Sequence, residues 1–226
     1  MTPGPRLDLH VHSAVSPDGR EPLDRLVAHL PALGLQGLAL TDHNTTRGVA
    51  RLGALQRERP DLLLVPGVEV SAAEGHLLVY GASEAPPAHR PLAELLDWCR
   101  QRTVVPVLAH PFRWTHGVGG VVARTAAVPA VETTNGHNGR RANARALEAA
   151  AGRNLGSTGG SDAHLLADLG RAWTRFPEGV ATVEAALEAL GRGSTIAEGR
   201  SASLPERCAS ALRSGGLRLR RGLRPL

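Results

Sequence analysis

The sequence predicts an α/β fold in which parallel strands close into a barrel. Short apolar runs alternate with longer stretches whose apolar spacing suits helices, and the alternation continues to about residue 197. Strands and helices that alternate in this way are typical of a parallel sheet with helices packed on its outside. Seven clear strand segments suit a barrel.

The expected elements follow one another in a regular order. The expected strands, rich in Leu, Val and Ala, are residues 6–12, 36–41, 62–70, 76–81, 104–109, 130–134 and 154–159, with a weaker candidate at 194–197. Leu, Ala and Val recur at helical spacing in residues 22–33, 46–59, 92–102, 140–152 and 180–190. Glu21 and Pro22 suit a helix start, whereas Gly34 and Gly152 suit helix ends.

The composition indicates one domain with a tail. A chain of 226 residues can bury one sizeable core. Because aromatic residues make up only 3% of the chain, that core must consist mainly of Leu, Val and Ala. We expect the domain at residues 1–199, and a basic, flexible tail at 200–226, where Arg, Ser, Gly and Pro dominate.

The positive charge comes from arginine alone, since all 26 basic residues are arginine and the formal net charge is +5. The excess lies after residue 199, so the domain itself is nearer to neutral. The total charge is therefore weak grounds for nucleic-acid binding, although a short nucleic acid remains a possible partner. The planar guanidinium also suits phosphate groups on small substrates.

The two cysteines, Cys99 and Cys208, form no CxxC pair, and this favours a reducing compartment. The N-terminus has no apolar run of the signal-peptide kind, and no stretch approaches 18 apolar residues. We therefore expect a cytoplasmic protein with no membrane partner. The oligomeric state is left open.

Asp8, His10 and His12 alternate with apolar residues in the segment LDLHVH. Alternate side chains of a strand share one face, so the three polar side chains point one way and the apolar ones the other. Two histidines placed like this can chelate one metal ion. By itself such a pair is more often a pair of surface or core histidines than a metal site.

Further polar residues follow apolar runs at the ends of later predicted strands. They are Asp42 with His43, Glu69, His110, and Asp162 with His164. Parallel barrels carry their active sites at the carboxyl ends of the strands, so these residues would converge in space. Nitrogen and carboxylate ligands without thiolate suit Zn²⁺, Mn²⁺ or Fe²⁺, and their number implies several ions.

Five segments carry a family resemblance. DLHVHSAVSPDG, ALTDHNTT, VPGVEVS, LAHP and GGSDAH resemble, in this order, the motifs of the PHP family, named for polymerase and histidinol phosphatase. The resemblance spans residues 7–164. It implies a distorted (β/α)7 barrel, a metal-dependent phosphoesterase and a centre of three divalent ions, which would be Mn, Zn or Fe, with Mg as a further option.

The resemblance also implies a set of metal ligands. His10, His12 and Asp162 would hold the first ion, Glu69 would bridge the first and second, His110 and His76 would complete the second, and Asp18, His43 and His164 would hold the third. Some relatives have histidine at the position of Asp18. His76 begins a predicted strand, whereas a ligand at a strand end would be more natural. A histidine in the turn after Gly75 therefore stays an alternative.

Other polar residues near these motifs are candidates for supporting roles. Arg113, directly after LAHP, could clamp a phosphate with two nitrogens, or could be an ordinary surface arginine. Asn135 is expected to contact substrate, and Glu132 is left open between a site and a structural role. Asp8 and Asp42 are expected to orient ligands from behind. A buried hydrogen bond for Asp8 and a turn cap for Asp42 are the alternatives.

The predicted function is hydrolysis of phosphate esters by a metal-activated hydroxide, with Glu69 and Asp162 as catalytic residues. The short spacing between Glu69 and His110 leaves no room for the additional domain that the resemblance implies for some nucleotide-cleaving relatives. This favours small phosphomonoesters or nucleotides, and oligonucleotides stay among the candidate substrates. Two alternatives remain: a non-catalytic, metal-stabilised PHP module, and an amidohydrolase-like enzyme. The module would usually lack ligands that this chain retains, and the amidohydrolase would usually require a bridging lysine that this chain lacks.

Overall fold

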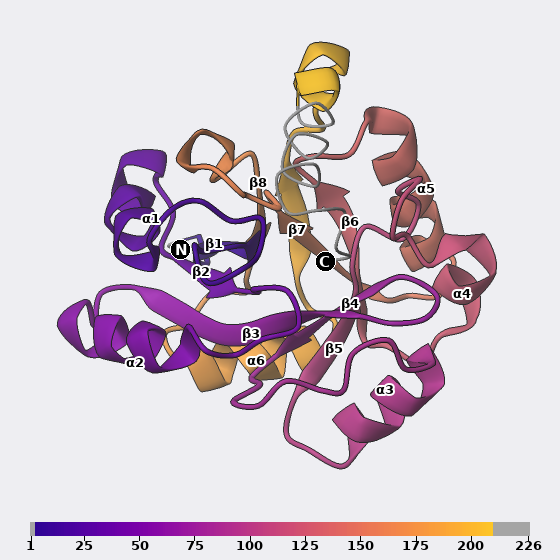
Figure 1. The fold of residues 1–226 in the computed structure, drawn as a ribbon, viewed down its shortest axis with the longest axis horizontal. Coiled ribbons are helices and arrows are strands. Elements are labelled where there is room, and N and C mark those ends of the chain that lie inside the picture. The colour runs from indigo at the N-terminus through magenta and orange to yellow at the C-terminus, as the bar shows by residue number, and fades with distance from the viewer. Residues whose placement is uncertain (1–2, 210–226) are drawn as a thin grey trace.

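The computed structural model describes residues 3–209 and has an α/β fold built on one curved, barrel-like sheet (Figure 1). Along the sheet the strand order is β7-β6-β5-β4-β3-β2-β1-β8-β9. The strands are β1 (Arg6–Val11), β2 (Gly37–Leu40), β3 (Leu63–Ser71), β4 (His76–Tyr80), β5 (Val105–Leu108), β6 (Ala130–Asn135), β7 (Gly156–Gly160), β8 (Ala172–Arg175) and β9 (Ile196–Gly199). The α/β fold predicted from the sequence is thus confirmed.

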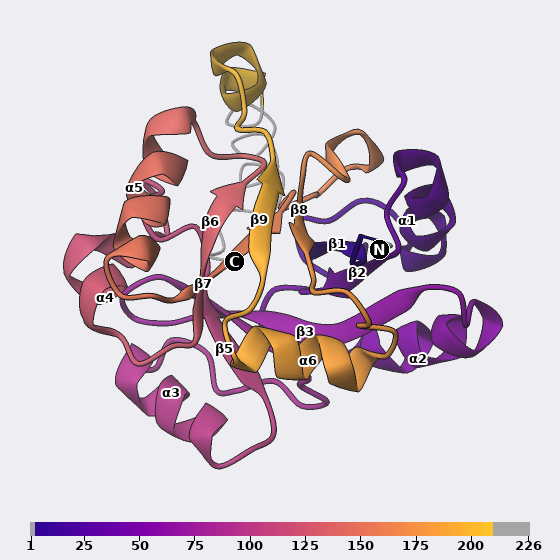
Figure 2. The same cartoon turned by 180° about the vertical axis from the view of Figure 1, so that it is seen from behind.

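The helices lie outside the sheet, as Figures 1 and 2 show. They are α1 (Leu23–His29), α2 (Val49–Glu58), α3 (Leu92–Arg100), α4 (Gly119–Thr125), α5 (Arg140–Ala151) and α6 (Val183–Gly191), with short 3-10 turns η1 (Leu30–Leu33) and η2 (Leu166–Asp168). The side chain of Thr182 caps α6 by accepting a hydrogen bond from the backbone N–H of Ala185.

The sheet nearly closes because β7 approaches the opposite end of the strand order. The N–H of Ser157 in β7 donates to the carbonyl of Thr195, and the N–H of Asp162 just after β7 donates to the carbonyl of His10. A side chain at Gly160 would collide with His10, since a Cβ there would lie 2.3 Å from the His10 Cβ. Glycine at this position therefore allows β7 to reach β1.

The barrel departs from the expected count of seven parallel strands. Within residues 3–209 there are nine strands, so that count is not confirmed. β4 pairs antiparallel with β3 and with β5, and β8 pairs antiparallel with β1 and β9. Since β4 is reversed, its first residue lies at the same edge as the carboxyl ends of its neighbours. His76, paired with Ser71, therefore lies at that edge.

Two elements were missed at the sequence level, and both depend on tertiary contacts. β8 has the mixed sequence AWTR, and its Trp173 and Arg175 both donate hydrogen bonds to Glu198 of β9. α4 opens with two glycines followed by two valines, which have low helix propensity. Neither segment carries the periodicity on which the sequence prediction relied.

The inside of the barrel is filled by apolar side chains from its strands and from α6. Leu7, Val65, Leu78 and Tyr80 are fully buried together with Leu190 of α6. The helix covers the end of the barrel that faces the viewer in Figure 2. The polar edge of the strands is thus left for a site at the other end.

Residues 200–209, the first part of the expected tail, pack against the domain. The N–H of Ala202 donates to the carbonyl of Asn138, and residues 204–209 form a helical turn, seen in yellow in Figure 1. Residues 210–226 lie outside the described part of the chain. Within residues 3–209, no helix has the length and apolar character needed to cross a bilayer.

Candidate metal centre

The nine ligands expected from the sequence meet at one edge of the barrel. His10 lies in β1, His12 directly follows it, and Asp18 belongs to the loop after that strand. Glu69 lies near the end of β3, and His76 begins β4. The others follow strands: His43 follows β2, His110 follows β5, and Asp162 and His164 follow β7. All nine are less than about one third exposed, and seven of them are buried. Residues separated by up to 154 positions thus form one polar cluster.

Glu69 lies at the centre of this cluster. Its Oε2 is 3.1 Å from His10 Nε2 and 3.3 Å from His12 Nε2. Its Oε1 is 2.8 Å from His76 Nδ1 and 2.9 Å from His110 Nε2. Oε2 also lies 3.3 Å from His43 Nδ1. One oxygen of this buried carboxylate therefore faces three histidines, and the other oxygen faces two different ones.

Among the described residues, three groups of side chains can converge on a metal ion. The first group is His10, His12, Glu69 and Asp162, the second is His43, Glu69 and His76, and the third is His12, Asp18, His43 and His164. In each group the ligand atoms lie within 4.8 Å of one another. The first group contains the four residues that the family resemblance placed around the first ion.

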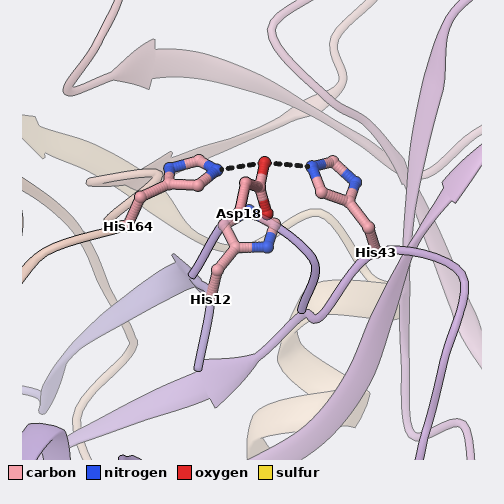
Figure 3. Close-up of side chains that lie close together, drawn as sticks. All are labelled: His12, Asp18, His43 and His164. Carbon is pink, nitrogen blue, oxygen red and sulfur yellow. Dashed lines mark hydrogen bonds and ion pairs between the residues drawn. The ribbon is translucent and has the colours of Figure 1, made fainter. Parts of the chain in front are cut away.

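The second and third groups also overlap with the expected shells. His76, whose role the sequence left open, belongs to the second group, and His110 contacts the same oxygen of Glu69 as His76 does. In the third group, shown in Figure 3, one oxygen of Asp18 lies 3.4 Å from His43 Nε2 and 2.9 Å from His164 Nε2. His12 joins this group in addition to the three expected ligands.

The spacing of the ligand atoms fits divalent cations. Two ligands that each lie about 2.1 Å from one ion are separated by about 3.0–3.4 Å at octahedral or tetrahedral angles. The two histidine nitrogens of the first group lie 3.1–3.5 Å from the oxygens of Glu69 and Asp162. His10 Nε2 and His12 Nε2 nevertheless make no hydrogen bond within the described residues, although both are buried. Buried polar atoms are normally hydrogen-bonded, so a bound cation would supply the partner that these two nitrogens lack.

The two buried carboxylates of the first group and the imidazole of His110 have charge states that suit cations. Burial alone would raise the pKa of Glu69, but the imidazoles of His10, His76 and His43 hold it well below its usual value. Burial likewise opposes ionisation of Asp162, yet Arg113 and His10 keep its pKa low. Burial and the charge of Arg113 lower the pKa of His110 to about 3, so this imidazole is neutral and its lone pair is available.

Glu132, whose role the sequence left open, orients two of the candidate ligands. Its Oε1 lies 2.9 Å from His10 Nδ1, and its Oε2 accepts a hydrogen bond of 2.7 Å from the backbone N–H of His110. The carboxylate is 1% exposed. A carboxylate on the second nitrogen of a metal-binding histidine sets its tautomer and ring orientation. The sequence feature that could have indicated this role is an acidic residue in the middle of a predicted strand segment.

Asp8 and Asp42 both lie behind the ligands, but they bind backbone groups and a serine rather than imidazoles. Asp8 is fully buried and accepts hydrogen bonds from the N–H groups of His10 and Ser161, which adjoin β1 and β7. Burial raises the pKa of Asp8 to about 6. Asp42 accepts from the N–H and the hydroxyl of Ser13. Both carboxylates thus hold the loops that carry the ligands.

Arg113 and Asn135 reach the cluster and contact each other. Arg113 Nη2 donates to Asn135 Oδ1 over 2.7 Å and also to Asp162. Asn135 is fully buried, and its amide nitrogen donates to Glu132 and Asp162. Direct substrate contact by Asn135 remains a prediction, and its burial favours a supporting role. The Arg113 side chain is 24% exposed and lies at the rim.

Two segments of the chain match models of known protein families. Residues 8–101 match the model of the PHP domain, and residues 140–195 match the model described as PHP-associated. Over 87 residues, 36% of this chain, the sequence is 37% identical to a phosphoribosyl 1,2-cyclic phosphate 1,2-diphosphodiesterase of Eggerthella lenta. Over 89 residues, also 36% of this chain, it is 39% identical to a 3',5'-nucleoside bisphosphate phosphatase of Chromobacterium violaceum.

These matches cover 32% and 30% of the length of the two relatives, so the chain spans about a third of each. The fold is similar to a two-domain protein of Bacteroides vulgatus described as containing a predicted PHP-like metal-dependent phosphoesterase. The TM-score is 0.67, at 20% identity, covering 87% of this chain and 65% of that one. With both family segments matched in order and the barrel in common, the chain belongs to the PHP family.

Proposed function

We propose that this protein hydrolyses phosphate esters with the help of divalent cations held by the three ligand groups. The observation that carries the proposal is the position of Glu69, whose two oxygens face separate sets of histidines. A carboxylate placed in this way can bridge two cations and fix their separation. Paired cations are the usual means of hydrolysing phosphate esters without a covalent intermediate.

The chain's own residues supply binding and orientation. Cations held by the groups would supply Lewis acidity, which activates water and neutralises charge on a phosphoryl group. His164 and Asp18 are 26% and 15% exposed, so the third group is the part of the cluster that a substrate reaches from solvent. Arg113 lies at the same rim and can donate to a phosphate oxygen. Glu69 and Asp162 are the proposed catalytic residues because they share ligand groups with His10 and His12.

A small phosphorylated substrate fits this site better than a long one. The described rim offers one arginine, Arg113, in direct contact with a member of the ligand cluster, which suits a single phosphoryl group. The names of the two curated relatives, one for a cyclic phosphodiester and one for a nucleoside bisphosphate, indicate which chemical classes to test first. A nucleotide or short oligonucleotide belongs in the same panel.

The test is a substrate panel run with Mn²⁺, Zn²⁺, Mg²⁺ or a chelator. It contains phosphomonoesters, nucleotides, nucleoside bisphosphates, cyclic phosphodiesters and short oligonucleotides. We expect at least one class to be hydrolysed, with loss of activity in the chelator. Glu69→Gln keeps the side-chain volume and should lower both bound metal and turnover, the latter by more than about 100-fold. Glu84→Gln, on an exposed glutamate paired with Arg102, is the matched control.

Two outcomes would contradict the proposal. A protein that binds its metals but hydrolyses no ester would be the non-catalytic, metal-stabilised module. A protein that cleaves amides in the same panel of metals, and no phosphate ester, would be the amidohydrolase-like enzyme. Unchanged metal content and turnover in Glu69→Gln would remove the assignment of the bridging carboxylate.

A further inference from the structure

Residues 200–209, here called the C-terminal segment, lie outside both segments that match the family models. In the structure this segment returns to the barrel edge that carries the metal ligands. It contacts Asn138 in the loop that follows β6, three residues after Asn135, the last residue of that strand. Its hydrogen bonds connect it to the residues that hold Arg113.

The first contact leads directly to Arg113. The N–H of Ala202 donates a hydrogen bond of 2.8 Å to the carbonyl of Asn138, and both residues are buried, at 6% and 3% exposure. The side chain of Asn138 in turn accepts a hydrogen bond of 3.0 Å from Arg113 Nε. One residue therefore joins the C-terminal segment to the guanidinium.

A second series of hydrogen bonds, through Asn143 and Asn135, also connects the C-terminal segment to Arg113. The side-chain amide of Asn143 donates to Ser201 Oγ over 3.0 Å and to the carbonyl of Asn135 over 3.1 Å. The side-chain oxygen of Asn135 accepts from Arg113 Nη2. The two asparagine oxygens that hold the guanidinium thus belong to residues tied, directly or through Asn143, to the C-terminal segment.

The segment is fastened on its other side as well. Glu206 accepts hydrogen bonds from the N–H and the hydroxyl of Ser203, and it lies 3.6 Å from Arg171. Arg171 also pairs with Asp168 at 2.9 Å. In Figure 1 the yellow helical turn of the segment stands between α5 and the loop that leads to β8. The segment therefore bridges two walls of the site.

These contacts leave one face of Arg113 available. Nε and Nη2 are engaged by Asn138, Asn135 and Asp162, whereas Nη1 donates to none of the described residues. A guanidinium has five donors in a fixed plane, so holding two of its nitrogens also fixes the direction of the third. The available donors can then engage an anionic oxygen without first losing side-chain entropy.

We propose that the C-terminal segment is a positioning element that holds Arg113 in the orientation needed to bind the phosphoryl group of the substrate. The proposal rests on the proposed function, since it assigns Arg113 to substrate phosphate. It identifies Ser201 and Ala202 as positioning residues that act through Asn143 and Asn138. The segment would affect substrate affinity while leaving the metal ligands in place.

The test uses two substitutions in the full chain that detach the segment by different means. Ala202→Pro removes the N–H that donates to Asn138, and Ala202→Glu places a charge in a buried position. Leu204→Pro is the matched control, because Leu204 is exposed and lies at the first position of the helical turn, where proline is tolerated. Binding of inorganic phosphate to the Mn²⁺-loaded proteins is measured by calorimetry.

Three readouts separate a positioning role from a general loss of structure. In both Ala202 variants the Kd for inorganic phosphate and the KM for an accepted ester should rise about five- to ten-fold, with kcat within about two-fold of native. Metal content should not change. Modification of Arg113 by phenylglyoxal, followed by mass spectrometry of the peptide, should become faster. Leu204→Pro should match the native protein in all three.

The proposal is overturned if both Ala202 variants keep native phosphate affinity and native labelling of Arg113, or if Leu204→Pro changes them equally. Failure of the proposed function is a different result, in which the native protein hydrolyses no ester in the panel. Phosphate binding and labelling of Arg113 need no turnover, so they decide the role of the segment in that case too.

Discussion

Replacing Glu132 by glutamine should weaken metal binding without removing any metal ligand. Glu132 Oε1 lies 2.9 Å from His10 Nδ1, while Oε2 accepts from the N–H of His110 and from the amide of Asn135. In Glu132→Gln the single remaining oxygen satisfies the two N–H donors on the Oε2 side. The new NH₂ group then faces His10 Nδ1, which must accept a hydrogen bond instead of donating one.

This substitution also changes the protonation of His10 Nε2, the other nitrogen of the same ring. A histidine that binds a cation is neutral and carries one proton. If Nδ1 becomes the acceptor, that proton must sit on Nε2, the atom that lies 3.1 Å from Glu69 and 3.5 Å from Asp162. A protonated Nε2 has no lone pair for a cation. Loss of such an orienting carboxylate typically costs 10–100-fold in metal affinity, which is about 1.4–2.7 kcal/mol.

Metal affinity and stoichiometry would be measured by competition with a chelating dye and by elemental analysis. We expect the affinity of one ion to fall, because among the three ligand groups only the first contains His10. Glu188→Gln, on an exposed glutamate paired with Arg192, controls for the loss of a negative charge. Equal affinities in a folded Glu132→Gln protein and in the native protein would refute the tautomer argument.

Three further predictions concern metal removal, a buried hydroxyl and the cysteines. Removing the ions should lower Tm, because ions at 100 times their Kd stabilise the native state by about 2.7 kcal/mol; an unchanged calorimetric Tm would contradict a metal centre. Tyr80→Phe removes a buried 3.0 Å hydrogen bond to the Leu9 carbonyl. A urea titration should show a free energy of unfolding lower by about 1 kcal/mol, while the metal content stays unchanged. Burial raises the pKa of Cys99 to about 11, so little of this thiol is ionised at pH 8. One thiol of the native protein, the exposed Cys208, should therefore react with Ellman's reagent, and both thiols should react in guanidinium.

The convergence of the candidate ligands at the strand ends could be predicted from the sequence because strand geometry is local. Alternation alone put His10 and His12 on one face, and the rule that parallel strands end at a common edge brought Glu69, His110 and Asp162 to them. Neither inference needed knowledge of which strands are neighbours. The family resemblance then supplied the grouping around individual ions.

Residues whose role depends on strand direction or on distant partners could not be predicted in the same way. His76 begins its strand, and only the antiparallel pairing of β4 with β3 and β5 shows that this end lies at the site. Glu132 gains its role from His10, 122 positions away. The packing of residues 200–209 depends on single hydrogen bonds, such as the one from Ala202 to Asn138, which leave no periodic pattern in the sequence.

Two of the proposed ligands occupy backbone conformations that would be unfavourable elsewhere. Asp162 has φ of 58° and His110 has φ of 25°, and such values cost non-glycine residues about 1–3 kcal/mol each. Other members of the cluster hold both in place: the N–H of Asp162 donates to the carbonyl of His10, and the N–H of His110 donates to Glu132. Because Glu132 also binds the His10 ring, one carboxylate couples the orientation of one ligand to the backbone of another. The proposed ligands are therefore held in place by contacts with one another, which is the arrangement that a preorganised metal centre requires.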